Sequence, residues 1–346
     1  MSDTKVFTSS TNPVPGSGQT IVVQSSPNFW KTWTGRIMMA ALGLSVVCNL
    51  SMYAAYHEYF ASTDPPQERF HSGDQFASSK ISILSVDGTI MPPFTERLLQ
   101  QIEHVTKDDG VKGVLLVVDS PGGLVADSHE IYHRLKLLAE KKPIYVQMKR
   151  MAASGGYYIS MGAGPQGRIY AEPTTWTGSI GVIIPRYDAS QLAEKIGVVS
   201  DPLKTGEFKD ALNPLRAMTA NERKLWDGIL DQSFQKFIKV IDDNRESLDS
   251  EAVKALATGQ IYTADDALQN KLVDEIGYQE DSLKALQEKL GLAKVRIVKY
   301  HSHTTLLEQL LGNAQAKPPV DPWKLIMEAS VPRAMYLCSW MPALPQ

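Results

Sequence analysis

The chain lacks the residue patterns that mark disulfide-rich, metal-binding and nucleic-acid-binding proteins. It has two cysteines, Cys48 and Cys338, which lie near opposite ends and have no metal-ligand spacing. Two such cysteines exclude a disulfide framework and a zinc knuckle. The formal net charge of −3 also differs from the basic face or stripe of a nucleic-acid binder. We therefore expect no metal, no organic cofactor and no nucleic-acid partner.

Histidine is missing between Ser154 and Tyr300, which matters because histidine is the usual base for a serine nucleophile. The seven histidines of the chain are His57, His71, His104, His129, His133, His301 and His303. Those at 104, 129 and 133 fall on predicted amphipathic helices, where we expect them to be solvated or structurally paired. A Ser–His–Asp triad is disfavoured but stays open, because the order of triad residues varies between folds.

One long run lacks charge altogether. Residues 37–56 read IMMAALGLSVVCNLSMYAAY, twenty residues without an acidic or basic side chain. A helix of this length spans about 30 Å, the thickness of the hydrocarbon layer of a membrane. A buried core helix is the alternative, and a cleaved signal peptide is disfavoured because no small-x-small site follows Ser51. Val47 before Cys48 does not fit a lipoprotein signal. The run therefore predicts one transmembrane helix.

The charges on either side of this run give its expected orientation. Lys31 and Arg36 precede it, whereas Glu58 and Asp64 follow it. The positive-inside rule then assigns the N-terminus to the cytoplasm and the rest of the chain to the extracytoplasmic side.

Composition divides the chain into five parts. Residues 1–36 are predicted to be a disordered cytoplasmic tail, 37–56 the anchor and 57–78 a polar linker. Residues 79–300 form the main domain, and 301–346 a tail with a leucine-rich helix followed by a proline-containing segment. Few large apolar groups in the first 30 residues mean that this stretch cannot bury enough surface to fold alone.

Strand and helix patterns alternate within the main domain. Residues 111–119 (VKGVLLVVD) form a continuous apolar run, typical of a strand that is buried on both faces. Further strands are predicted over 80–86, 143–148 and 295–300, and helices over 96–106, 126–140, 219–244, 264–270 and 282–290. This alternation predicts an α/β domain with largely parallel strands.

Residues 151–160 (MAASGGYYIS) contain the first candidate chemical motif. Ser154 is followed by two glycines between a strand and a helix, an arrangement that resembles a nucleophile turn. Such a turn projects the hydroxyl, and its small neighbours let the substrate backbone approach. The amide of Gly155 would be available to stabilise an oxyanion. The alternative is a helix start with Ser154 as its N-cap, and this motif alone favours that interpretation.

Residues 119–125 (DSPGGLV) directly follow the apolar strand. Ligands bind at the carboxyl ends of strands in α/β sheets. The amides of Gly122 and Gly123 are therefore candidates to pair with a substrate strand or to line an oxyanion hole. Taken alone, the motif mostly indicates a turn.

Lysine is the remaining common base for a serine nucleophile. An unperturbed lysine has a pKa of about 10.4, so it acts near neutrality only where its surroundings lower that value. Lys209 lies in TGEFKDALNP beside Phe208 and Leu212, which is compatible with a partly apolar setting. These observations do not choose Lys209 among the lysines that follow Ser154.

Several segments together resemble the signal peptide peptidase A family of serine proteases. They are SPGG (120–123), AASGGYYI (152–159), AEPTTWTGSIGVI (171–183), GEFKDALNP (206–214) and GQIYTADDALQNKLVDEIG (259–277). The matches occur in the family's order and span roughly residues 79–300. The resemblance implies a ClpP/crotonase-like α/β fold and a Ser/Lys dyad. It also implies cleavage of signal peptide remnants at the bacterial inner membrane.

The resemblance also assigns roles to individual residues. Ser154 matches the family's nucleophile, Lys209 its general base, and Ser179 the serine that orients the lysine amine. Gly122 and Gly123 match the turn that presents substrate and oxyanion amides. Short members of the family assemble as homo-oligomeric rings, octameric where described, and the serine and lysine of one site come from neighbouring subunits.

Two departures from the family pattern are visible. Residues 161–167 (MGAGPQG) are a few residues longer than usual, and Val117 stands where many members have arginine. Two rival functions also follow from the sequence. One is a ClpP-like Ser–His–Asp peptidase, which the histidine-free stretch disfavours. The other is a non-catalytic, ring-forming membrane scaffold of the same fold, and the presence of Ser154, Lys209 and Ser179 counts against it.

Overall fold

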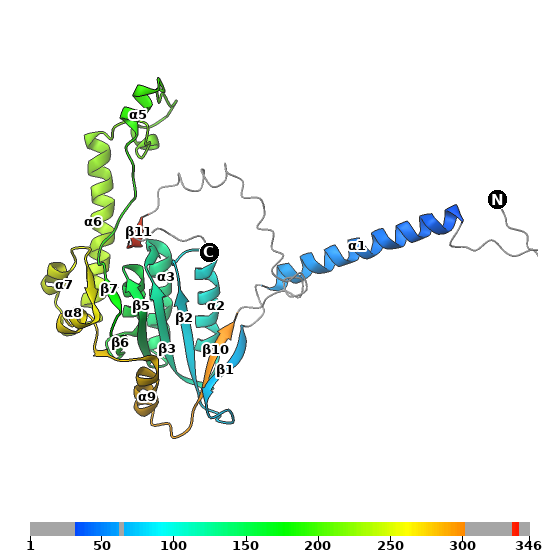
Figure 1. Ribbon diagram of the computed structural model, residues 1–346, viewed down its shortest axis with the longest axis horizontal. Coiled ribbons are helices and arrows are strands. Elements are labelled where there is room, and N and C mark those ends of the chain that lie inside the picture. The colour runs from blue at the N-terminus through cyan, green and yellow to red at the C-terminus, as the bar shows by residue number, and fades with distance from the viewer. Residues whose placement is uncertain (1–31, 62–65, 302–333, 339–346) are drawn as a thin grey trace, which may run out of the picture. The chain divides into compact units, whose positions relative to one another are not determined.

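Residues 32–61, 66–301 and 334–338 are described by the computed structural model of the chain (Figure 1). The chain divides into two compact units, Met1–Asp64 and Pro65–Gln346. The described part of the first unit is a single helix, α1 (Trp33–Ala61). The second unit contains the sheet and all other described helices.

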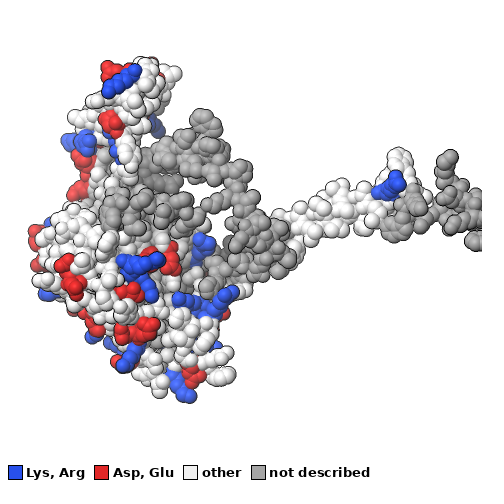
Figure 2. Space-filling view, viewed as in Figure 1, with Lys and Arg blue, Asp and Glu red and all other residues white. Residues whose placement is uncertain are grey.

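Helix α1 contains the uncharged run predicted to cross a membrane. Its first 21 residues, Trp33–Tyr53, are long and apolar enough to do so, and no other helix among the described residues meets that description. Figure 2 shows its surface almost without acidic or basic side chains. Length and composition thus agree with the prediction of an apolar helix over 37–56.

The second unit is built on a nine-stranded sheet. Its strand order is β1-β10-β2-β3-β5-β6-β9, with β7 beside β5 and β8 beside β7. The strands are β1 (Gln67–Gly73), β2 (Lys80–Asp87), β3 (Val111–Ser120), β5 (Ile144–Ala153), β6 (Ile169–Ala171), β7 (Trp176–Gly178), β8 (Ile261–Thr263), β9 (Glu275–Ile276) and β10 (Arg296–His301). Neighbouring strands from β10 to β9 are parallel, as are β5 and β7. Strand β1 pairs antiparallel with β10, and β8 pairs antiparallel with β7.

The helices follow the strands in the order expected for an α/β domain. They are α2 (Phe94–Lys107), α3 (Val125–Ala139), α4 (Gly155–Ser160), α5 (Ser190–Lys195), α6 (Ala220–Asp242), α7 (Ser250–Leu256), α8 (Ala264–Gln269) and α9 (Gln279–Lys289). A second, two-stranded sheet joins β4 (Gly122–Leu124) to β11 (Met335–Leu337).

The central strands are buried on both faces. In β3, Leu116 and Val118 belong to the hydrophobic cluster that contains the inner faces of α2, α3 and α6. Leu115 and Val117 belong to a second cluster, with Leu286 of α9. Successive side chains of a strand point to opposite faces, so the part of a strand that is covered on both sides must be apolar at every position. This explains the continuous apolar run from Val114 to Val118.

The predicted α/β fold is confirmed, and the predicted elements of 79–300 occur within a few residues of their expected bounds, although β5 extends five residues further. Helix α6 illustrates why one boundary is well defined. The Thr219 hydroxyl accepts a hydrogen bond from the Glu222 N–H (3.2 Å), and the Glu222 carboxylate accepts one from the Thr219 N–H (2.8 Å). This capping box satisfies two N–H groups that the helix itself leaves unpaired.

The structure adds one strand to each of the two parts that flank the main domain. The proposed linker over 57–78 contains β1, which pairs antiparallel with β10 at the edge of the sheet. Its sequence, QERFHSG, is almost entirely exposed, so it lacks the apolar alternation by which strands are recognised. The tail over 301–346 contains β11, where no strand was expected. The predicted leucine-rich helix lies outside the described residues.

Candidate active site

Ser154 lies on a strained turn between β5 and α4. Its φ is +54° and its ψ −111°, a conformation that costs a non-glycine residue about 1–3 kcal/mol. Ser154 stands at the N-cap position of α4, but its side chain makes no capping hydrogen bond to the helix. The residue is 1% exposed. Strain of this kind persists where the surrounding structure enforces it, as at a nucleophile turn.

Ser179 lies next to Ser154 because two parallel strands end together. Strand β7 pairs with β5 so that Gly178 is opposite Ala153, and each serine is the first residue after the end of its strand. The Ser154 N–H donates to the Gly178 carbonyl at 2.7 Å, and the Ser179 N–H donates to the Gln260 carbonyl at 2.7 Å. Ser179 also has a positive φ, of +50°. The two predicted serines are thus held at adjacent turns.

Three predicted glycines converge on the same turn. A methyl group added to Gly155 would lie 3.1 Å from both the Gly122 Cα and the Gly123 nitrogen. One added to Gly122, whose φ is +101°, would lie 2.7 Å from the Gly155 nitrogen. These backbones approach so closely that none of the three positions has room for a side chain. The structure therefore brings Gly122, Gly123 and Gly155 together beside Ser154.

One buried residue at this turn was missed by the sequence analysis. Ser128 of α3 is fully buried, and its Oγ has no hydrogen-bond partner among the described residues. That oxygen lies 2.7 Å from the position of a methyl group added to Gly155. A serine at the third position of the helix predicted over 126–140 gives no signal of such a placement.

Among the described residues no hydrogen bond joins a histidine to Ser154. His129 instead pairs its Nδ1 with the Tyr158 hydroxyl at 2.7 Å. Burial lowers the pKa of His129, with smaller contributions from Lys236 and His133. His129 is thus paired with a tyrosine of the core, as expected for a structurally paired histidine on an amphipathic helix.

Lys209 lies elsewhere in the unit. It belongs to a 3-10 turn, Glu207–Asp210, whose residues are not buried, and its side chain is exposed. The turn is part of residues 184–218, which we call the arm. The arm includes α5 and projects from the sheet (Figure 1). The expected partly apolar setting of Lys209 is therefore not found within one chain. Nor does any hydrogen bond among described residues join its amine to Ser154 or Ser179.

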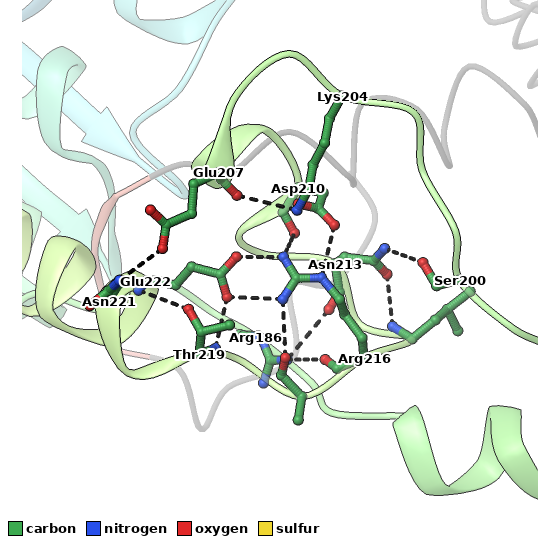
Figure 3. Close-up of polar contacts among 12 residues, drawn as sticks. Arg186, Ser200, Lys204, Glu207, Asp210, Asn213, Arg216, Thr219, Asn221 and Glu222 are labelled. Atoms are coloured by element: carbon green, nitrogen blue, oxygen red, sulfur yellow. Dashed lines mark hydrogen bonds and ion pairs between the residues drawn. The ribbon is translucent and has the colours of Figure 1, made fainter.

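A network around Arg216 fixes the base of the arm (Figure 3). The Arg216 guanidinium donates to the Asp210 carboxylate at 2.8 Å through Nε, and it pairs in bidentate fashion with the buried Glu222 of α6. Lys204 binds the other Asp210 oxygen at 2.5 Å. Hydrogen bonds from Arg216 hold the pKa of both carboxyls well below their usual range. Asp210 directly follows Lys209, so this network fixes the backbone on which the lysine is carried.

The arm also exposes many large apolar side chains. They include Tyr187, Leu192, Ile196, Val199 and Leu203, the last of which is 100% exposed. Monomeric soluble proteins rarely expose apolar residues in such numbers on one segment, and where they do the surface is usually an interaction site.

Comparison with known proteins identifies the family. Residues 136–293 match the model of peptidase family S49, and residues 74–177 match that of Clp protease. A protein of Enterococcus faecium that carries the name signal peptide peptidase SppA is 36% identical over 272 residues, which cover 75% of this chain and 77% of that protein. The chain belongs to the signal peptide peptidase A family, peptidase family S49. It is a serine-type peptidase.

Other members of family S49 differ in length. The protease slr0021 of Synechocystis is 34% identical over 235 residues, which cover 67% of this chain and 83% of that one. Protease 4 of Salmonella typhi is 32% identical over 216 residues, 62% of this chain but 34% of that protein. A solved structure of a mutant of the 1510-N membrane-bound stomatin-specific protease is similar over 61% of this chain and 86% of its own, with 16% identity and a TM-score of 0.42.

The predicted ClpP-like fold is confirmed by the match to Clp protease and by the observed parallel sheet.

Proposed function

We propose that the protein is a membrane-anchored endopeptidase in which Ser154 and Lys209 form the catalytic dyad. The observation that carries the proposal is the convergence of Ser154, Ser179 and the three glycines at one buried turn. A hydroxyl on a strained turn, flanked by backbone amides, is what nucleophilic acyl transfer requires. Membership of family S49 supports the same reading.

The reaction follows from these groups. The Ser154 Oγ attacks the carbonyl carbon of the peptide bond while its proton passes to the neutral Lys209 amine. The resulting oxyanion accepts hydrogen bonds from the amides of Gly155 and the 122–123 turn. The C–N bond then breaks, and the lysine returns the proton to the leaving amine. Water, activated by the same lysine, hydrolyses the acyl-enzyme. Ser179 orients the lysine amine, and no metal or organic cofactor takes part.

The lysine of each site comes from a neighbouring subunit in this proposal. Support comes from the position of Lys209 on an exposed turn of the arm, without a hydrogen bond to either serine of its own chain. Apolar side chains along the arm would be buried against another copy, since burying such a side chain stabilises an assembly by about 1.5–3 kcal/mol. A closed homo-oligomeric ring, octameric by analogy with short family members, gives every arm a neighbour.

The proposed substrates are apolar peptides at the membrane, including remnants of signal peptides. Support comes from α1, whose apolar surface suits a bilayer, and from the name of the Enterococcus faecium relative. With the N-terminus in the cytoplasm, the catalytic unit would face the extracytoplasmic side of a bacterial inner membrane. Pockets next to the cleaved bond should accept small or aliphatic residues and reject charged ones.

Two experiments test the proposal. A fluorophosphonate probe should label the full-length protein at Ser154, and the Ser154→Ala variant should not react. A protein that cleaves no peptide and resists the probe would be the non-catalytic scaffold instead.

The shared site is tested by mixing two inactive variants, Ser154→Ala and Lys209→Ala, before assembly. Random mixing should restore about a quarter of the sites, because one neighbouring pair in four combines an intact serine with an intact lysine. Rings of either variant alone serve as controls. If mixed rings form normally but stay as inactive as the controls, each subunit carries its own dyad.

A further inference from the structure

Strands β3 and β5 do not pair residue for residue where they approach the candidate site. Their register shifts between Val118 and Ser120 of β3. Asp119 therefore faces three residues of β5, numbers 149–151, which we call the bulge. Bulges occur next to active sites, where they redirect the chain that follows. Ser154 comes three residues after the bulge, so the irregular pairing lies directly before the candidate nucleophile.

The Asp119 carboxylate binds two residues of the bulge. Its Oδ2 accepts a hydrogen bond from the Arg150 Nε at 2.7 Å and lies 2.6 Å from the Arg150 Nη2. Its Oδ1 accepts a hydrogen bond from the Met151 N–H at 3.3 Å. The Asp119 side chain is only 11% exposed, whereas that of Arg150 is 87% exposed. A largely buried carboxylate thus supports the irregular backbone, and Arg150 reaches it from the solvent.

The bulge is also held on the side away from β3. The buried Thr175 hydroxyl donates to the Lys149 carbonyl at 2.5 Å, and β7 begins opposite Met151. The backbone of Asp119 is fixed as well, because the Gly88 N–H donates to its carbonyl at 3.0 Å. The bulge therefore has defined contacts on both sides, and on the β3 side its side-chain support is Asp119.

The backbone that Asp119 supports leads into the strained turn of Ser154. Strain of the kind seen in its φ and ψ persists only where the surrounding structure enforces it. The Ser154 N–H donates to the Gly178 carbonyl, and its own carbonyl accepts from the Tyr158 N–H at 2.8 Å. Both contacts lie at or after the turn, so the bulge decides how the chain enters it. On β3, Gly122 follows Asp119 by three residues. One carboxylate thus adjoins both the nucleophile turn and the glycine turn.

We propose that Asp119 is a positioning residue of the peptidase reaction. By holding the bulge of β5, its carboxylate sets the distance between the Ser154 hydroxyl and the amides proposed to receive the oxyanion. Asp119 itself touches neither the substrate nor the reacting atoms. Its loss should lower kcat and leave KM nearly unchanged, because an arrangement needed only in the transition state contributes to kcat and not to substrate binding. This inference rests on the proposed role of Ser154 as nucleophile.

The test compares variants of the full-length protein on one apolar fluorogenic peptide. Asp119→Ala should lower kcat about a hundredfold and change KM less than about threefold, since small displacements of reacting groups have effects of this size. Asp119→Asn keeps an acceptor oxygen for the Met151 N–H but loses the charge that pairs with Arg150. It should lower kcat about tenfold, and it serves as the test where the alanine variant does not fold. Arg150→Met should keep kcat within about threefold, because exposed ion pairs contribute little.

Asp274→Asn is the matched control for a merely structural effect. Asp274 makes contacts of the same kind, since it accepts from the Ile169 N–H at 2.7 Å and from the Arg245 guanidinium at 2.9 Å. Ile169 pairs with Val146 near the start of β5, far along the strand from Ser154. This variant should lower the unfolding temperature yet keep kcat within about threefold. Equal losses of kcat in Asp274→Asn and Asp119→Asn, or near-normal kcat in both Asp119 variants, would refute the positioning role.

Two further measurements separate this inference from the catalytic proposal. Amide hydrogen exchange over residues 149–156 reports the bulge without catalysis, and it should become about tenfold faster in Asp119→Asn but not in Asp274→Asn. The rate of fluorophosphonate labelling reports the nucleophile. An unmutated protein that the probe does not label at Ser154 would refute the catalytic proposal. Asp119 variants that are labelled as fast as the unmutated protein would refute only the positioning role.

Discussion

Replacement of Arg216 by methionine should loosen the base of the arm and with it the position of Lys209. Arg216 is the shared partner of Asp210, which follows the lysine, and of Glu222, which begins α6. Methionine keeps much of the side-chain length but donates no hydrogen bonds. The Arg216→Met variant therefore leaves the Glu222 carboxylate buried without its cation.

The magnitude follows from the burial of these groups. The Glu222 side chain is 1% exposed, whereas that of Arg216 is 22% exposed. Removing one partner of a fully buried ion pair costs about 3–5 kcal/mol. Water can reach this site once Arg216 is gone, and Glu222 keeps its hydrogen bond from the Thr219 N–H (2.8 Å). We therefore expect about 2 kcal/mol, which is roughly a thirtyfold change in a local opening equilibrium.

Amide hydrogen exchange of the full-length protein measures this opening directly. Peptides that cover residues 206–222 should exchange about thirtyfold faster in Arg216→Met, and peptides from β3 should be unaffected. Lys239→Ala is the matched control, because the Lys239–Asp243 pair on α6 is exposed, with 72% and 40% of the side chains accessible. Such pairs contribute only about 0.3–0.5 kcal/mol. Adding Glu222→Gln to the Arg216→Met variant should restore part of the protection, because it removes the buried charge.

Peptidase activity of Arg216→Met should fall as the lysine loses its fixed position. Unchanged exchange over 206–222, or an equal effect in the Lys239→Ala control, would refute this account of the arm.

The remaining predictions concern the pH response and the site itself. Because the folded-state pKa values of Asp210 and Glu222 are lowered, their contribution is complete above the ordinary carboxyl range and is lost as pH falls through the lowered values. The protection factors of amides over 206–222, which correct for the intrinsic pH dependence of exchange, should thus fall only below about pH 4, and a fall between pH 5 and 8 would contradict the network. Because the proposed dyad needs a neutral amine, kcat/KM should rise with pH above neutrality, and a maximum below about pH 6 would exclude a lysine base. Gly122→Ala should lower kcat/KM about a hundredfold or more, because its methyl group would lie 2.7 Å from the Gly155 nitrogen, whose amide is proposed to receive the oxyanion, whereas Gly291→Ala, also at positive φ but with nothing within 4 Å, should keep activity. His129→Gln should retain kcat within about threefold, and a hundredfold loss would reinstate a histidine base.

Local sequence determined much of the fold. The run over 111–119 predicts a doubly buried strand because its central side chains, Val114–Val118, are all apolar, and Thr219 with Glu222 marks the start of α6. These signals are short-range, so a single sequence contains them. Strand β1 was missed because it carries no such local signal. An exposed edge strand is stabilised by its backbone pairing, here with β10, and its side chains need not alternate between apolar and polar.

The candidate site could be predicted only in part. The glycine-flanked serine at 154 and the Pro-Gly-Gly turn before it are local motifs, and the resemblance to a family added Ser179 and Lys209. Tertiary structure alone decided that β7 ends beside β5 and so sets Ser179 next to Ser154. It also decided that Lys209 is exposed on the arm and that Tyr336 reaches the glycine turn from more than 200 residues along the chain. Backbone pairing and close approach between distant segments depend on the folded path of the whole chain, and no local spacing of residues encodes them.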